Sequence, residues 1–337
     1  MNEIQVSTDP NRLYIRFIAL WILSEAFLGG VVHGLKLPVS GLLIGGCAGI
    51  CICLIAWFVP VRGALLKATL VVAIFKMMLS PHSPPAAYIA VFFQGILGEF
   101  LLRNRRLFGL MCLIFGILIM AESALQRILV LTLIYGTDFW EALDMFVLKV
   151  SGDATVQKFS ISLAIGYVLM HLVVGAVLGS LTWRLIRKTA LWNETEWIIE
   201  IPQNLSMKAQ ISREQKPAKI LKSGLLLIWL FLLAAFIQSV VQPKSAWLPA
   251  NAVLAIVLRS ILILLTWYLI LSPLLMRYLH LWLNKQKAKS SAFIGEVVAI
   301  LPEVQYLVSQ SWDNSHNRKG PGRFLLFCKI LLINILH

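Results

Sequence analysis

Charged residues are scarce in this chain of 337 residues: they make up 14% of it, whereas hydrophobic residues make up 59%. An ordinary soluble domain carries about 25% charged residues, with which it covers its surface. The deficit excludes that class and indicates an integral membrane protein. Acidic residues are the scarcer kind, since 16 Asp and Glu stand against 30 Lys and Arg and the net charge is +14.

The motifs of several enzyme classes are also missing. The sequence contains no GxSxG nucleophile motif, no HExxH zinc motif and no glycine-rich phosphate loop. If the protein uses ATP, another chain must supply the ATPase, and we do not expect an enzyme. The cysteines are few. The first four lie within predicted spans and the last in the apolar C-terminal run, which suits packing residues and predicts neither a disulfide nor a metal site or other cofactor. They are Cys47, Cys51, Cys53, Cys112 and Cys328.

Apolar runs long enough to cross a bilayer, which takes about 20 helical residues, recur along the chain. They cover 14–32, 39–59, 63–80, 86–102, 107–127, 160–183, 222–241 and 251–272. The apolar run 324–336 is shorter and suits an interfacial or re-entrant helix. The sequence therefore predicts an all-α, polytopic membrane helical bundle with about eight transmembrane helices, arranged as six plus two.

The basic residues predict the orientation of these spans. With a cytoplasmic N-terminus, all but seven of the 30 Lys and Arg fall on the cytoplasmic side, as the positive-inside rule requires. We therefore expect a multi-pass protein with both termini in the cytoplasm. The positive net charge then reflects topology and affinity for anionic membrane lipids, and nucleic-acid binding is not expected. The seven outer residues are Lys36, Lys76, Arg127, Lys149, Lys158, Lys244 and Arg259.

Composition divides the chain into three parts. Residues 1–188 form the six-span domain, 189–221 a polar cytoplasmic linker, and 222–337 a two-span module followed by cytoplasmic amphipathic helices and the apolar C-terminal segment. In the linker, TEWIIEIP (195–202) predicts a short strand ended by Pro202. In the tail, Pro302 is expected to break the amphipathic stretch into two helices. The apolar face of that stretch consists of Phe293, Val297, Leu301, Val304 and Val308.

Polar side chains inside the spans are the candidates for function, because burial in a bilayer is costly and usually turns such a group toward the protein interior. Each also has a structural interpretation. Glu122 and Gln126 have the spacing of a contact between helices, and His171 can be a packed, hydrogen-bonded residue. Glu25 can pair with Lys36 or with Lys76. Glu99 is expected to pair with the nearby RNRR cluster, 103–106.

Two of the loops predicted to lie on the outer side of the membrane are associated with further polar residues. SPHSPP (80–85) joins the third and fourth predicted spans, and its prolines stiffen the loop and start the next helix, on which Tyr88 and Gln94 lie. This arrangement is typical of a lid over a ligand site, although a structural turn is an equal alternative. The longest connection, 136–159, contains FWEALDMF, which predicts a short amphipathic helix.

The six-span layout over about residues 12–188 and the stretch FVPVRGALLKA (58–68) resemble the substrate-binding S components of energy-coupling factor transporters. The resemblance implies a bacterial inner-membrane protein that binds a vitamin or a related nutrient. It also implies partners, namely a scaffold T component and two cytoplasmic ATPases. The C-terminal two-span module resembles a truncated T component.

The resulting hypothesis is uptake of a small-molecule ligand from outside, driven by ATP hydrolysis in separate subunits. Substituting Gln94 and Glu122 separates it from the alternative of a non-transporting membrane scaffold or assembly factor, which recruits a cytoplasmic partner through its basic tail. An intramembrane enzyme using Glu122 and His171 is the third hypothesis. The predicted ligand-binding residues are His82, Tyr88, Gln94, Glu122, Gln126, Arg127 and Trp140.

Overall fold

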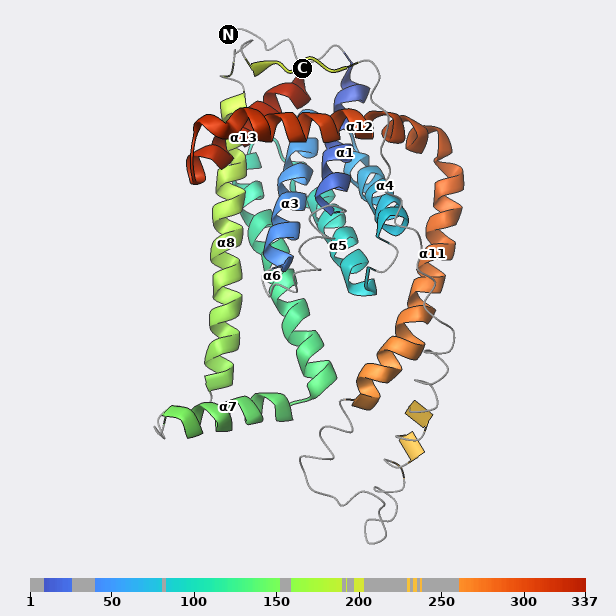
Figure 1. Cartoon of the computed structure of the whole chain (residues 1–337), viewed down its shortest axis with the longest axis vertical. Coiled ribbons are helices and arrows are strands. Elements are labelled where there is room, and N and C mark those ends of the chain that lie inside the picture. The colour runs from blue at the N-terminus through green and yellow to red at the C-terminus, as the bar shows by residue number, and fades with distance from the viewer. Residues whose placement is uncertain are drawn as a thin grey trace. The chain divides into compact units, whose positions relative to one another are not determined.

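The regular elements are all helices in the part of the chain that a computed structural model describes, namely residues 9–25, 40–80, 83–151, 159–189, 192, 197–202, 229–230, 233–234, 237 and 261–337. The main helices are α1 (Pro10–Leu23), α3 (Ser40–Phe58), α4 (Ala64–Leu79), α5 (Pro85–Leu101), α6 (Phe108–Tyr135), α7 (Asp138–Ser151), α8 (Phe159–Thr189), α11 (Ser272–Lys289), α12 (Ser291–Asn314) and α13 (Pro321–Leu336) (Figure 1). The predicted all-α class is confirmed.

Five helices are long and apolar enough to cross a membrane among the residues described. They are Gly41–Phe58, Phe108–Tyr135, Phe159–Thr189, Ile261–Lys289 and Ser291–Asn317. The first three coincide with predicted spans, and the fourth continues the last predicted span well beyond residue 272. The predicted run 222–241 lies mostly outside the described residues. The chain is thus a helical membrane protein.

The residues group into two compact units. The first unit comprises Met1–Ser123, His171–Ile211 and Trp282–His337, and the second comprises Ala124–Met170 and Ser212–Leu281. The first unit therefore joins the N-terminal helices to the C-terminal helices α12 and α13. The division into residues 1–188, 189–221 and 222–337, which was expected from composition, stays a prediction.

Helix α1 is the centre of the first unit. It contacts α3, α4, α12 and α13, and its aromatic residues Phe17 and Trp21 are fully buried. Asp9 caps the helix by accepting a hydrogen bond from the Asn11 amide at 2.9 Å, and Pro10 occupies the first turn, where its missing N–H costs nothing. Helix α5 likewise has a proline in its first turn, Pro85, as predicted.

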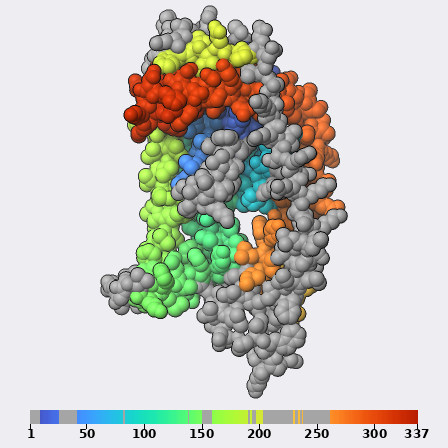
Figure 2. All heavy atoms as spheres, viewed as in Figure 1, coloured from blue at the N-terminus to red at the C-terminus, as the bar shows by residue number. Residues whose placement is uncertain are grey.

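Helix α12 remains one helix through Pro302, so the predicted break there is wrong. Proline removes one backbone hydrogen bond, but the apolar face is buried on both sides of it, at Val297, Leu301 and Val304. That face packs on α1 and α13. α12 runs across α1, and α12 and α13 together form a continuous layer over it (Figures 1 and 2).

The strand predicted over 195–202 is also absent from its described part, 197–202, which is irregular apart from a single residue in a 3₁₀ turn. The Ile199 amide donates to the side-chain oxygen of Asn334 at 2.7 Å instead of to a neighbouring strand. The side-chain amide oxygen of Asn334 in α13 thus accepts the backbone hydrogen bond that a neighbouring strand would otherwise accept.

In the second unit, FWEALDMF lies in helix α7, as predicted. Asp144 of α7 accepts hydrogen bonds from the amide and the hydroxyl of Ser160, at 2.6 and 2.9 Å, which ties α7 to the start of α8. The indole of Trp140 donates to the Thr132 hydroxyl at 3.0 Å. These polar contacts fix α7 against the ends of both neighbouring helices.

Glycines bring α6 and α8 into backbone contact in the first unit. Gly175 and Gly179 of α8 are spaced as in the small-xxx-small motif, and they lie against the backbone of Gly116 and Cys112 of α6. Any side chain at Gly175 would overlap the carbonyl oxygen of Gly116. A flexible neighbour could move aside, whereas backbone cannot.

We therefore expect Gly175→Leu to destabilise the first unit by about 1–3 kcal/mol, the usual cost of overpacking. The measurement is thermal unfolding of the purified protein in detergent. Gly166→Leu is the matched control, since a side chain at Gly166 of the same helix meets open space. Equal melting temperatures for the two variants would contradict the close contact.

Candidate functional site

A buried ion pair joins the end of α1 to α4. Glu25, just beyond α1, accepts from Lys76 Nζ at 2.5 Å, and the two side chains are 4% and 5% exposed. Of the two partners considered for Glu25, the structure shows Lys76, whereas Lys36 lies outside the described residues. A lysine and a glutamate buried together in an apolar helical unit are costly unless they pair, so each fixes the position of the other.

Tyr88 and Gln94 lie on the buried face of α5. Helices α4 and α5 form an antiparallel pair in which Gly95 faces Thr69. Tyr88 lies seven residues before Gly95 on α5, and Lys76 lies seven residues after Thr69 on α4. Because the two helices are antiparallel, Tyr88 and Lys76 are at the same height along the pair. Both α5 side chains are buried, and the Tyr88 hydroxyl and the Gln94 Oε1 have no hydrogen-bond partner among the described residues.

Glu122 approaches the same region from α6. Its Oε2 atom is buried and, within the described part of the chain, likewise lacks a hydrogen-bond partner. Its neighbour Ser123 contacts Gly41 of α3, and one turn further along α3 Gly45 lies against both the Gln94 amide and Met120 of α6. The glycines of α3 thus let polar side chains of α5 and α6 come close to it from two sides.

We call Glu25, Lys76, Tyr88, Gln94 and the half-buried Glu122 the buried polar cluster. A buried polar atom without a partner costs about 1–3 kcal/mol, and such atoms are normally satisfied by water or a ligand. The charge of Lys76 is already neutralised by Glu25. The unpartnered atoms are two oxygens that accept hydrogen bonds and one phenol, so the cluster is suited to a ligand that presents N–H or O–H donors.

The other predicted ligand residues lie elsewhere. Gln126 and Arg127 of α6 and Trp140 of α7 belong to the second unit, and the Arg127 side chain is exposed. His82 lies outside the described residues. Among those described, no group of three or more His, Cys, Asp or Glu side chains is arranged to hold a metal ion.

Sequence reasoning gave Lys76 as one of two possible partners of Glu25, and the structure shows this pair. It missed the contribution of α3 to the cluster. The glycine-rich start of α3, GLLIGGCAG, was not interpreted, although small residues in a membrane helix commonly mark close contacts.

A second polar site, the Arg16 junction, joins α1 to the C-terminal helices. Arg16 is only 3% exposed and forms an ion pair with Glu303 of α12 at 2.6 Å. It also donates to the carbonyl oxygens of Asn334 and Ile335 at the end of α13, at 3.4 and 3.2 Å. Free carbonyls at a helix end attract a cation, so one guanidinium holds both C-terminal helices.

Comparisons of the chain with protein-family models, with curated proteins and with solved structures found no match.

Proposed function

We propose that this chain is a membrane transport protein that binds a small molecule in the buried polar cluster, in the manner of an S component. The observation that carries the proposal is the presence of three partnerless polar atoms, on Tyr88, Gln94 and Glu122, in the interior of an apolar helical unit. A merely structural polar contact would bond these groups to one another; instead, their hydrogen-bonding atoms are available to water or to a bound ligand, and the proposal assigns them a ligand.

The proposed topology has about eight spans, six plus two, in a bacterial inner membrane with both termini in the cytoplasm. Four of the five apolar helices overlap spans of this topology, and together with the distribution of basic residues they support it. The fifth, Ser291–Asn317, is a cytoplasmic amphipathic helix in this proposal. The proposed ligand is a vitamin or a related nutrient. Since the unpartnered groups are mainly acceptors, its buried part carries amine, amide or hydroxyl hydrogens.

ATP is hydrolysed by separate subunits in this proposal, and the C-terminal helices receive the resulting motion. α12 contacts α1 through the Arg16 junction, and Glu25 follows nine positions later, about 14 Å along the helix axis. A displacement of α12 therefore acts on the same helix that carries one member of the buried polar cluster. This path supports coupling between a cytoplasmic partner and ligand release.

The test begins with the tagged protein purified in mild detergent and mass spectrometry of bound small molecules and partner proteins. We expect a bound nutrient-like molecule in the wild type. Its affinity should fall about tenfold or more in Glu122→Gln, which replaces one carboxylate oxygen by an NH2 donor, and in Gln94→Leu, which removes the buried amide acceptor. Glu141→Gln, at an exposed position on α7, is the matched control and should bind normally.

Two results would contradict transport. One is unchanged ligand affinity in both variants while they remain folded. The other is recovery of cytoplasmic proteins with no ligand in any preparation, combined with loss of those proteins when the basic tail is changed. That second result would establish the scaffold function in its place.

A further inference from the structure

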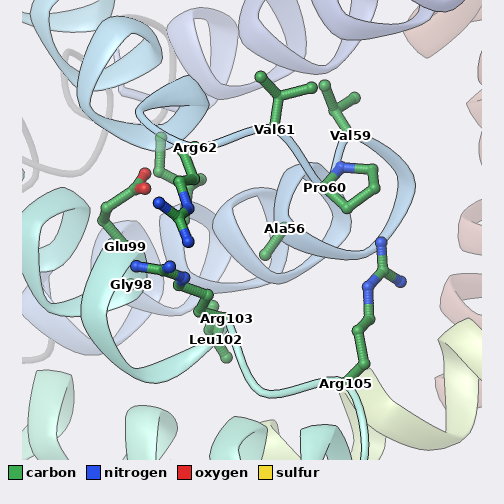
Figure 3. Close-up of a pocket in the computed structure, with 11 residues that line it drawn as sticks. Ala56, Val59, Pro60, Val61, Arg62, Gly98, Glu99, Leu102, Arg103 and Arg105 are labelled. Carbon is green, nitrogen blue, oxygen red and sulfur yellow. The ribbon is translucent and has the colours of Figure 1, made fainter.

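A pocket of about 230 Å³ opens between two turns at one end of the first unit (Figure 3). One wall is the turn between α3 and α4, which includes Pro60 and Arg62. The opposite wall is the end of α5 and the turn after it, with Glu99, Arg103 and Arg105. Ala56, Val59 and Leu65 contribute apolar surface. The pocket therefore combines guanidinium groups with an aliphatic lining.

The pocket lining contains three arginines and a single carboxylate, that of Glu99. Figure 3 shows Arg62 and Arg103 pointing toward one another from the two walls. Neither of them, nor Arg105, forms an ion pair with any described residue. Arg105 stacks over the Trp57 ring at 4.6 Å, and desolvation lowers its pKa from the ordinary value without removing its charge at neutral pH.

Glu99 is the one acidic residue of the lining, and it is engaged elsewhere. Its predicted pairing with the RNRR cluster is wrong, because its Oε1 accepts a hydrogen bond from the Gly63 amide at 2.7 Å. Gly63 has φ of +78°, which turns this amide toward α5. Three arginines thus line a pocket with one carboxylate; Arg62 and Arg103 lie close together, and Arg105 stands apart from them beside Pro60 (Figure 3). Such a lining suits a phosphate or a similar anion.

The surface of α5 identifies the source of the anion. Ile89, Phe93, Ile96 and Phe100 follow one another at helical spacing and are all exposed, Phe100 by 79%. This spacing places them in one apolar stripe along the helix. Arg103 follows Phe100 by three positions, so the stripe leads directly to the basic pocket. In a membrane, such a stripe is covered by acyl chains whose headgroups lie at its end.

We propose that the pocket formed by Arg62, Arg103 and Arg105 binds the phosphate of an anionic phospholipid whose acyl chains lie along the apolar stripe of α5. The arginines neutralise the headgroup, and Val59, Pro60 and Leu65 contact its glycerol backbone. Binding here requires only that the helices span a membrane, so it does not depend on what the buried polar cluster binds.

The test is native mass spectrometry of the full chain in detergent micelles with added phosphatidylglycerol, compared with phosphatidylcholine of the same acyl chains. We expect phosphatidylglycerol to bind the wild type at least about tenfold more tightly. The double variant Arg62→Gln/Arg103→Gln should lose this preference. Arg106→Gln/Arg187→Gln removes two exposed charges outside the pocket lining and should keep it.

Arg62→Lys/Arg103→Lys guards against a folding defect, because it retains both charges and should retain most of the preference. Equal binding of the two lipids to the wild type would overturn the proposal. So would an unchanged preference in the glutamine variant. Displacement of phosphatidylglycerol by millimolar inorganic phosphate would also overturn it, since the pocket would then serve a free anion.

Discussion

Replacing Lys76 with methionine is expected to cost about 3–5 kcal/mol of folding free energy, because it leaves the Glu25 carboxylate buried without its partner. Methionine retains the length and the apolar stem of lysine, so loss of packing contributes little. Both side chains are almost fully buried, and solvent therefore screens the remaining charge poorly. The measurement is thermal or denaturant unfolding of the purified protein in one detergent.

The double variant Glu25→Leu/Lys76→Met separates an unpaired charge from a lost attraction. Replacing a buried ion pair by apolar residues is often close to neutral, so most of the stability should return. If the double variant were as unstable as Lys76→Met, the pair itself would hold the helices together. If Lys76→Met were as stable as the wild type, the pair would have to be accessible to water.

Arg16→Met is expected to release α12 and α13 from α1. The change removes an ion pair with Glu303 and two hydrogen bonds to the end of α13, and it leaves Glu303, which is 13% exposed, without its closest partner. We expect a loss of about 3–5 kcal/mol in the docking of these helices. Limited proteolysis should then cut the C-terminal helices at protease concentrations that leave the wild type intact.

Arg12→Gln is the matched control, since Arg12 pairs with the same Glu303 at 3.0 Å but its side chain is 49% exposed. An exposed pair contributes about 1 kcal/mol or less, so proteolysis should hardly change. Under the proposed function, Arg16→Met should retain ligand binding and lose transport. Normal transport by a variant with freed C-terminal helices would contradict the coupling path through α1.

The elements of the fold follow largely from local sequence features. Apolar runs predicted the helices at 41–58, 108–135 and 159–189 because bilayer thickness fixes their minimum length. The amphipathic spacing of α12 predicted the burial of Val297, Leu301 and Val304. The prediction of a break at Pro302 was wrong because it considered only the local cost of a proline inside a helix. The packing of α12 on α1 and α13, which keeps the helix continuous, is visible only in the three-dimensional structure.

The candidate site was less predictable. Counting residues along a helix gives the depth of a side chain in the membrane, but it does not show which side chains of other helices lie next to it. The sequence placed Tyr88 and Gln94 on one helix, and the structure shows both side chains to be buried. The choice of Lys76 for Glu25 depends on the register between α1 and α4, which no local pattern encodes. Likewise, the RNRR cluster (103–106) is close to Glu99 in sequence, but in the folded chain the Glu99 carboxylate accepts a hydrogen bond from the backbone amide of Gly63.

The Arg16 junction also imposes an order on biosynthesis. Arg16 and Glu303 are 287 positions apart, so α1 is made long before its partner exists. At a synthesis rate of about 5–20 residues per second, Glu303 is added to the chain roughly 15–60 s after Arg16. During that interval α1 must keep Arg16 in contact with water or with the membrane surface. The first unit can therefore complete its packing only after α12 and α13 have been synthesised.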